Sequence, residues 1–519
     1  MTPARVLVWL ALPLSIAPCV AHAGEPELLD CSRADSRIVL RASARLDPAC
    51  TWTGGIGIHA SDVVLDCQGA RIVGPLRGRG IEISAPTDTA LSNVTVRNCH
   101  VEGFLNSLRV TRDGFRDLAE GVEYENAFAN IRIEDSTFSG SRGVCVFVDG
   151  YVTDVTLRRS RIEGCGSSGV YLETGSKDNV VEDCDIVGNG YTENGPYWQR
   201  FALGGADFWF WGTGREGLSI DGSRFNHIVG NRFSGNSYGS IFLYKNCGEF
   251  PDSRPNAWFD RRYHADGNVI AGNTFSGDRN GVWIGARMGE NTLPMECSDP
   301  QYRFGYVLDY AADNVVRDNE FIDVDYGVRV EDDRNTVADN RFVGAGNQQA
   351  IVVGTRYRTA DLGRPVRDTV VTDNVAEIAG NAEPYRWHYR HADTTFARNT
   401  SRGAPARLCE GTPPWTAPFV MAQTVQLAST GEPPAEPPRP IPTPAALRPC
   451  PCPGDCGGDG EVTVDELVQG VRIALGGADV FSCAAFDVDA DTAVTVDDLA
   501  AAIHAILTGC DGSVAGDVW

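Results

Sequence analysis

Charged and aromatic side chains recur at fixed positions in a set of short apolar segments. The segments are GVYLE (169–173), GLSID (217–221), SIFLY (240–244), GVWIG (281–285), GVRVE (327–331) and AIVVG (350–354). Their valine, leucine and isoleucine residues alternate, and a strand of period two sends the residues between them to the opposite face. One outward position holds Tyr171, Ser219, Phe242, Trp283 and Arg329, and the next holds Glu173, Asp221, Tyr244 and Glu331. Aromatic faces stack on sugar rings while carboxylates and guanidinium groups hold hydroxyls and charges, so this set predicts a saccharide-binding face.

Paired carboxylates on this face are one candidate for catalysis. Glycoside hydrolysis needs one carboxyl group as general acid and a second as base or nucleophile. Asp221 beside Glu173 could supply the pair, as could Glu331 with Asp332 and Asp333.

The sequence leaves alternative roles for His264, Arg329 and Glu331, and it also fits one further class of protein. His264 is a candidate acid/base or substrate-binding residue, but an isolated loop histidine is more often structural. Arg329 and Glu331 are either substrate-binding groups or a cross-turn ion pair. A noncatalytic surface protein that binds glycan fits the same face.

A second repeated motif must position these strands. Short apolar segments end in a small polar residue at one equivalent position: Cys99, Ser136, Ser160, Cys184, Asn231, Asn273, Asn319, Asn340 and Asn374. Such repeats indicate a solenoid, in which each turn is stabilised by stacking on its neighbours. We expect each asparagine to take a left-handed backbone at a corner and to bond the asparagine one turn away.

The spacing of the motif shows where the solenoid carries insertions. Bare turns take 24 residues (136 to 160 and 160 to 184) or 21 (319 to 340), whereas the three turns between 184 and 319 take 47, 42 and 46. The inserted segments 187–214, 246–267 and 286–312 flank the outward carboxylates. Long insertions in a compact repeat usually serve function, so we expect them to wall a cleft.

Composition indicates an exported protein. Residues 1–23 read as a secretory signal, with Arg5 before an apolar stretch and an Ala21-His22-Ala23 cleavage pattern, which predicts a secreted, extracellular or surface-associated chain. Later apolar runs are too short to cross a bilayer. Sixteen cysteines suit an oxidising compartment, and we expect the pairs Cys31–Cys50 and Cys247–Cys297. The formal charge of −24 argues against nucleic acid as a partner.

The chain divides by composition into five parts. After the signal we expect an N-terminal cap (24–54), the solenoid (55–408), a proline-rich linker (409–449) and a compact tail (450–519).

The repeats resemble the right-handed parallel β-helix of the pectate-lyase-like superfamily. The resemblance implies an all-β solenoid whose glycine-led strands form the sheet that usually carries polysaccharide-cleaving sites. Chondroitinase B and similar alginate lyases place a lysine base and an arginine acid on neighbouring turns near carboxylate-bound calcium. The resemblance implies Lys245 and Arg287 in these roles, although Lys245 aligns with Ala286, and Glu173, Asp221 and Glu249 as candidate calcium ligands. The aspartate pair and Gly-His-Gly of polygalacturonases are not found.

The predicted function is therefore cleavage of an extracellular acidic polysaccharide by β-elimination. In that reaction a base removes the proton α to the uronate carboxylate while a cation neutralises the carboxylate. Glycoside hydrolysis and glycan binding without catalysis are the alternatives.

The tail contains two acidic loops, 455–466 and 487–498, each before an amphipathic helix. Their spacing matches the oxygen ligands of an EF-hand, which bind Ca²⁺. The candidate ligands are Asp455, Asp459, the Glu461 carbonyl, Thr463 and Glu466 in the first loop, and Asp487, Asp489, Asp491, the Ala493 carbonyl, Thr495 and Asp498 in the second. Gly457 supplies no side-chain ligand, and Thr492 replaces the usual glycine. The tail resembles a dockerin module, which implies a cohesin-like or cell-surface partner.

Overall fold

The computed structural model describes most of the predicted solenoid and parts of the tail. The described residues are 26–191, 198–203, 206–211, 214–246, 261–286, 310–345, 348–355, 358, 363–379, 384–388, 393–401, 409–410, 426–428, 453–456, 462–475, 483–486, 494 and 496–508. The predicted signal, Arg287, Glu249 and the Cys247–Cys297 pair lie outside them.

Three sheets, here called A, B and C, form the body of the described chain. Sheet A has, in order, β1 (Glu27–Leu29), β3 (Ala44–Leu46), β6 (Val64–Asp66), β9 (Ser92–Arg97), β12 (Ala129–Glu134), β15 (Val155–Arg158), β18 (Val180–Glu182), β23 (His227–Val229), β26 (Val269–Ala271), β29 (Val315–Arg317), β32 (Thr336–Ala338), β35 (Val370–Thr372) and β38 (Thr395–Ala397). Sheet B has β2 (Ile38–Leu40), β5 (Ile56–Ile58), β8 (Arg79–Pro86), β11 (Asn106–Asp113), β14 (Val146–Val148), β17 (Val170–Leu172), β22 (Glu216–Asp221), β25 (Gly239–Tyr244), β28 (Asn280–Ile284), β31 (Tyr326–Val330), β34 (Gln349–Val353), β37 (Tyr385–Trp387) and β40 (Cys409–Glu410). Sheet C has β4 (Thr51–Trp52), β7 (Arg71–Val73), β10 (His100–Glu102), β13 (Thr137–Ser139), β16 (Arg161–Glu163), β19 (Asp185–Val187), β24 (Arg232–Ser234), β27 (Thr274–Ser276), β30 (Glu320–Ile322), β33 (Arg341–Gly344), β36 (Val375–Ile378) and β39 (Thr400–Ser401).

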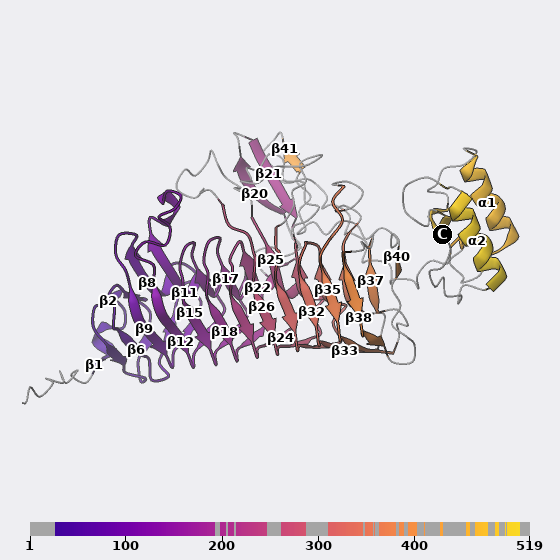
Figure 1. The fold of residues 1–519 in the computed structure, drawn as a ribbon. Coiled ribbons are helices and arrows are strands. Elements are labelled where there is room, and N and C mark those ends of the chain that lie inside the picture. Colours follow the sequence, from indigo (N-terminus) through magenta and orange to yellow (C-terminus); the bar gives the residue numbers. More distant parts are fainter. Residues whose placement is uncertain are drawn as a thin grey trace, which may run out of the picture.

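Each coil contributes one strand to each sheet and pairs in parallel with the next coil, as in β22 with β25 and β25 with β28. The strands therefore stack along one axis, from β1 at one end to β40 at the other (Figure 1). The predicted parallel β-helix is confirmed.

The ends of the solenoid differ from the expected boundaries. Residues 24–54, expected as a cap, contain β1 to β4, and these strands join all three sheets. Residues 409–449, expected as a linker, begin with β40 in sheet B and include β41 (Gln426–Ala428). β41 pairs antiparallel with β21 (Ala206–Trp211), which also pairs with β20 (Trp198–Leu203) from the first insertion.

The core is a stack of like side chains from successive coils. Phe233, Phe275, Phe321 and Phe342 occupy equivalent positions in β24, β27, β30 and β33, with ring centroids 5.2, 4.6 and 4.7 Å apart. All four rings are buried. This arrangement follows from parallel register, because it places each residue directly over its counterpart one coil away.

The predicted polar ladder runs inside the corner between sheets A and C. The backbone N–H of Asn231 donates to Oδ1 of Asn273 at 2.9 Å, and the N–H of Asn273 donates to Oδ1 of Asn319 at 2.9 Å. The ladder continues through Asn340, Asn374 and Asn399, and before Asn231 it uses Cys184, Ser160, Ser136 and Cys99. The expected bond to the neighbouring turn is confirmed.

The expected left-handed backbone at the ladder asparagines is wrong. The left-handed residue is the one before, such as Asp318 (φ 56°), Asp339 (φ 56°) and Asp373 (φ 59°). Because this residue makes the sharp bend, the asparagine that follows can point its amide inward and reach both neighbouring coils.

Disulfides close several coils of the described chain. Cys31–Cys50 is confirmed, and the sequence did not indicate Cys67–Cys99, Cys145–Cys165 or Cys456–Cys483. Cys184 is the free cysteine among the described residues and is buried.

The tail contains two α-helices, α1 (Val464–Ala474) and α2 (Val496–Thr508). They pack around buried Phe486, with Ile473 and Ala502 in the same apolar cluster. Neither helix is long and apolar enough to cross a bilayer.

We predict that Asn273→Ala lowers the free energy of unfolding by roughly 2–4 kcal/mol, because it leaves the buried N–H of Asn231 without its acceptor. Asn273→Ser should cost less, since Ser136 and Ser160 fill the same position in earlier coils. Denaturant unfolding checks the values, with Thr274→Ala on the outer surface as the control. An Asn273→Ala variant as stable as the control would contradict the role given to the ladder.

Candidate functional site

The candidate site lies on the outer face of sheet B, where the predicted rows of side chains come together. Tyr171 pairs with Ser219, Ser219 with Phe242, Phe242 with Trp283 and Trp283 with Arg329. In the second row Asp221 pairs with Tyr244. The predicted alignment of these residues on one wall of the solenoid is therefore confirmed.

These rows are covered rather than open. Tyr244 and Trp283 have no exposed surface, and Tyr171 is 6 % exposed. The rings pack on each other, with Phe242 edge-on to Trp283 at 5.4 Å and Tyr171 stacked on Phe147 at 4.9 Å. A sugar ring reaches the faces of Tyr244 or Trp283 only if these side chains are uncovered.

Glu173 and Asp221 form the centre of a buried group, here called the carboxylate cluster, with Arg261, Tyr171 and Asn246. Nη1 of Arg261 donates to Glu173 Oε1 at 2.7 Å and to Asp221 Oδ2 at 2.8 Å. The Tyr171 hydroxyl donates to Asp221 Oδ2 at 2.7 Å, and the backbone N–H of Asn246 donates to Asp221 Oδ1 at 2.7 Å. Asp221 is thus bonded through both oxygens, whereas Glu173 has fewer donors.

Burial and neighbouring charges set the pKa of the Glu173 carboxyl group. Burial raises the pKa of Glu173, the Arg261 guanidinium opposes that rise, and the neighbouring charges of Asp221 and Asp149 add to it. Burial likewise raises the pKa of the Tyr171 hydroxyl well above its usual range. A buried carboxyl group with a raised pKa beside a second carboxyl group is a common arrangement for a general acid.

Further charge pairs lie on both sides of the carboxylate cluster along the same face. Arg109 binds Asp149 through two hydrogen bonds of 2.7 Å and lies 4.8 Å over the Phe147 ring. On the other side, the Tyr244 hydroxyl donates to Glu216 Oε1 at 2.9 Å and accepts from Arg215 at 3.2 Å.

Glu331 lies further along the face with an indole and a guanidinium as partners. Trp283 Nε1 donates to its Oε1 at 2.9 Å, and Arg329 donates to the same oxygen at 3.0 Å. Arg329 also lies 3.4 Å over the Trp283 ring. Burial raises the pKa of Glu331 to about 7. Arg329 and Glu331, two residues apart on one coil, therefore form an ion pair, but within a coil and not across turns as one of the two alternatives expected.

Asp332 and Asp333, the predicted catalytic partners of Glu331, are already bound by Arg358. Arg358 donates to Asp332 at 2.5 Å and to Asp333 at 2.7 Å, and the N–H of Ala311 donates to Asp332 at 2.6 Å. Arg358 and backbone N–H groups thus engage both aspartates, so neither is a free carboxylate partner for Glu331.

Histidine 388 is a residue of this face that the sequence reading missed. It follows β37 in the row of Glu331, with Gly354 on the coil between them, as the bonds of Gly354 and His388 to Val330 and Val353 show. Burial lowers the pKa of His388 to about 3, with Arg386 and Arg329 adding to the effect. Its buried Nδ1 has no hydrogen-bond partner among the residues that the structure describes. The sequence YRWH (385–388) could have indicated it. Arg386 points outward in this strand, so His388, two residues later, points to the same face.

The other predicted residues take separate places. Lys245 is buried between Tyr244 and Asn246, whose backbone bonds the carboxylate cluster. His264 stacks on Tyr310 at 4.4 Å, with Nδ1 3.8 Å from Asp266. Arg261 was missed because it lies in an insertion, 40 residues from Asp221 and 88 from Glu173, where repeat spacing gives no register.

Arg261 lies between Glu173 and Asp221, two of the predicted calcium ligands. Arg261 binds the oxygens that would face the ion, so in this arrangement the cation of the site is Arg261.

Sequence comparison identifies the family of this chain. Residues 63–249 and 259–360 match the family described as periplasmic copper-binding protein (NosD). The chain belongs to this family. The matched ranges cover the coils that carry the carboxylate cluster, Phe242, Trp283 and Glu331. No curated protein matches this NosD-family chain by sequence.

Solved structures with a similar course of the chain are distant. The A-module of an Azotobacter vinelandii mannuronan C-5 epimerase is 13 % identical, with 74 % of this chain and 91 % of that chain covered and a TM-score of 0.42. An alginate lyase from Paenibacillus sp. is 16 % identical, with coverages of 72 % and 98 % and a TM-score of 0.36. The Dettilon tailspike protein is 11 % identical, with coverages of 74 % and 62 % and a TM-score of 0.41. At these scores the likeness says nothing about the reaction.

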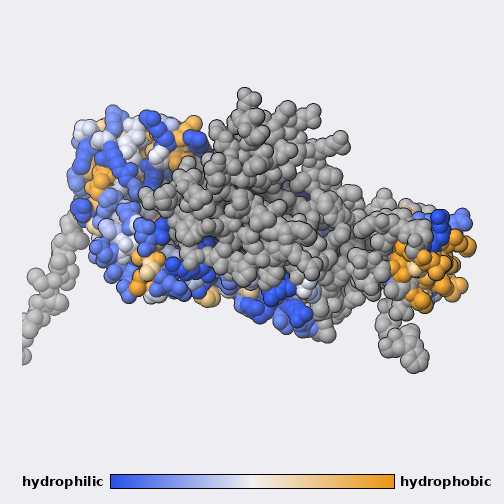
Figure 2. Space-filling model, turned by 90° about the horizontal axis from the view of Figure 1, so that it is seen from above, coloured by the Kyte–Doolittle hydropathy of each residue, from blue (hydrophilic) through white to orange (hydrophobic). Residues whose placement is uncertain are grey.

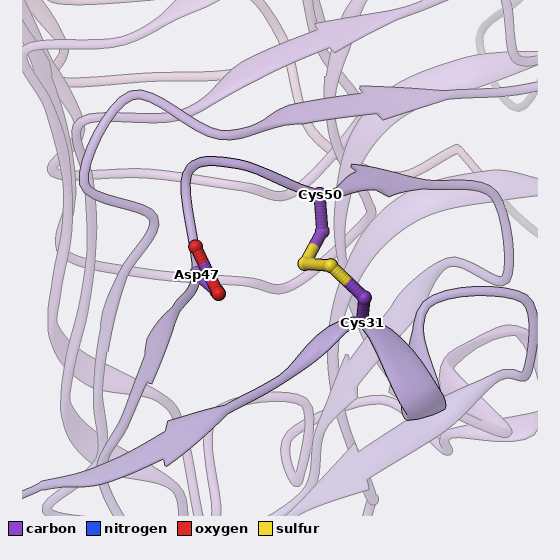
Figure 3. A group of neighbouring side chains, drawn as sticks. All are labelled: Cys31, Asp47 and Cys50. Carbon is purple, nitrogen blue, oxygen red and sulfur yellow. A yellow bond between two sulfur atoms is a disulfide. The ribbon is translucent and has the colours of Figure 1, made fainter.

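The group of potential metal ligands that the described part of this NosD-family chain brings together does not fit a copper site. Copper ligands in proteins are mainly thiolate, thioether and imidazole groups. Among the histidines, cysteines, aspartates and glutamates of the described ranges, one group of three lies close together. It consists of Cys31, Asp47 and Cys50 (Figure 3). Cys31 and Cys50 are bonded to each other as a disulfide, so neither offers a thiolate.

We predict that Glu331 makes stability depend on pH. Its pKa rises from 4.5 to about 7 on folding, so its contribution is present below about pH 4.5 and is lost as the pH rises through about 7. Glu331→Gln keeps an acceptor for Trp283 and Arg329 without the charge. Relative to wild type, its free energy of unfolding should therefore rise by on the order of 3 kcal/mol from about pH 4.5 to about pH 8.

Denaturant unfolding across this pH range measures the difference, with Glu320→Gln, in an exposed ion pair with Arg341, as the control. A constant difference between Glu331→Gln and wild type would contradict the raised pKa.

Proposed function

We propose that this protein cleaves an acidic polysaccharide by β-elimination at the carboxylate cluster. The observation that carries the proposal is that one guanidinium, Arg261, binds two adjacent buried carboxyl groups, one of which has a raised pKa. The site thus combines a cation, a carboxyl group suited to hold a proton and a neighbouring lysine. The described disulfides and the periplasmic family description support a place outside the cytoplasm.

Arg261 can supply the positive charge that proton removal from a uronate requires. A carbon acid α to a carboxylate is far too weak unless the carboxylate charge is neutralised, and Arg261 can do this by a bidentate contact. A uronate carboxylate would then take the place of one protein carboxylate on the guanidinium. This exchange favours an acidic sugar over a neutral one.

The remaining steps need a base and an acid. Lys245 acts as the base and removes the proton α to the carboxylate. The electron pair forms the carbon–carbon double bond, and the glycosidic carbon–oxygen bond breaks. Glu173, protonated because burial raises its pKa, gives its proton to the leaving oxygen. Arg287, which lies outside the described residues, is the alternative acid predicted from the resemblance.

One observation favours hydrolysis as the second candidate. Glu173 and Asp221 both lie within 2.8 Å of one nitrogen, so their oxygens are closer than the roughly 6.5 Å minimum of inverting glycosidases. A hydrolase with this pair would retain configuration, with Asp221 as nucleophile and Glu173 as acid.

We predict that Lys245→Ala and Glu173→Gln each lower the rate by roughly 10²–10⁴-fold without loss of folding. Glutamine keeps an acceptor for Arg261, so Glu173→Gln removes the proton donor with little other change. The assay follows the ultraviolet absorbance of unsaturated uronate on alginate, pectate, chondroitin and dermatan.

The control is Glu163→Gln, in an exposed ion pair on sheet C. Melting curves check folding of each variant. New reducing ends without unsaturated product would instead support the hydrolase, and retention of a glycan without products would contradict catalysis altogether.

We also propose that the tail binds Ca²⁺ and serves as the tether. Thr463 and Glu466 form a capping box at the start of α1, where the last ligands of the first loop are expected, and Asp455 and Asp498 are buried carboxylates. The other candidate ligands, Asp459, Glu461, Asp487, Asp489, Asp491, Ala493 and Thr495, lie outside the described residues. A cohesin-like or cell-surface partner remains a prediction from the resemblance.

We predict that calcium at one hundred times its dissociation constant stabilises the tail by about 2.7 kcal/mol, because an ion that binds the native state must stabilise it. Calorimetry of the full chain with and without calcium measures the shift. Glu466→Gln keeps the capping box but should weaken the shift, whereas Asp465→Asn should not. Equal melting in calcium and in chelator would reject the calcium site.

A further inference from the structure

Large apolar side chains are exposed on both helices of the tail. Val464 is 69 % exposed and Leu475 at the end of α1 is 81 % exposed, while Val496 and Leu507 of α2 are 79 % and 76 % exposed. Figure 2 shows the result as hydrophobic surface gathered over this end of the molecule. Exposed apolar patches of this kind mark interaction sites.

The exposed residues follow the same spacing on each helix. The intervals are four, three and four residues, through Val464, Val468, Val471 and Leu475 along α1 and through Val496, Ala500, Ile503 and Leu507 along α2. At 3.6 residues per turn each set forms one narrow stripe. We call the two stripes together the helix-pair surface.

The stripes are separate from the faces that hold the tail together. Gly470 and Ile473 of α1 and Ala502 and Ala505 of α2 are buried and lie on the opposite side of each helix. Both helices are therefore apolar on two faces. One face packs on the core around Phe486, and the other is exposed.

The spacing of the stripes indicates a helical partner. Alternating intervals of four and three place apolar residues along a seam that receives the side chains of another helix. The seven large side chains expose on the order of 700 Å² together, close to the roughly 800 Å² that each partner gives to a stable interface.

We propose that the helix-pair surface binds the helix-pair surface of a second copy of this chain. Each copy offers two stripes with one spacing, so the surface is complementary to itself, as a two-fold interface requires. The stripe residues carry no charge, and the repulsion between two acidic chains is screened at physiological salt. The result is a dimer joined through α1 and α2, which presents two β-helices together.

Sedimentation of the full chain in calcium-containing buffer tests the proposal. Wild type should associate to a dimer, and Val468→Lys with Ile503→Lys, one change at the centre of each stripe, should weaken association at least tenfold. Both side chains are exposed, so the variant should fold. Leu28→Lys, an exposed apolar residue of β1, is the matched control and should leave association unchanged.

Two results would overturn the proposal. A wild-type chain that stays monomeric at its highest soluble concentration would mean that the surface serves a different partner, such as a cohesin-like protein, or a segment of the same chain. A dimer that survives the double lysine substitution would place the interface elsewhere. Neither result depends on whether the protein cleaves a polysaccharide.

Discussion

The fixed register between neighbouring coils is the constraint on which the rest of this structure depends. Inside the corner between sheets A and C, each asparagine accepts the N–H of the coil before it and donates to backbone of that coil, as Asn273 does toward Asn231 and Ile228. A buried backbone N–H without an acceptor is costly, so every coil is held at one position relative to the next. The phenylalanine stack and the outer rows on sheet B follow from that register.

Register also explains the electrostatics of the outer face. Coils about 4.8 Å apart bring Asp149, Glu173 and Asp221 into one row, and burial makes adjacent carboxylates expensive. Guanidinium groups offset this cost: Arg109 binds Asp149, and Arg261 binds both Glu173 and Asp221. Burial raises the pKa of Glu173 although Arg261 opposes the rise, and the proposed chemistry depends on this raised pKa.

The elements that follow the repeat could be predicted from the sequence. The strands of sheet B, the rows through Tyr171 and Asp221 and the ladder asparagines all follow from period and spacing. Arg261 and the ion pairs of Arg358 could not be placed, because insertions and irregular loops have no repeat to align. The burial of Tyr171, Tyr244 and Trp283 could not be predicted either, because strand periodicity assigns these side chains to the outer face and does not show that they are covered. The left-handed bend was assigned to the asparagine because asparagine tolerates it, whereas the preceding residue, often an aspartate or a glycine, makes it.

Arg261 is the group that we propose receives an acidic sugar. A crystal structure of the Lys245→Ala variant with a saturated oligouronate tests this most directly. We expect a uronate carboxylate within hydrogen-bond distance of the Arg261 guanidinium, with the glycosidic oxygen beside Glu173. An oligosaccharide bound away from sheet B, or Arg261 still bonded to both Glu173 and Asp221 with the sugar in place, would contradict it.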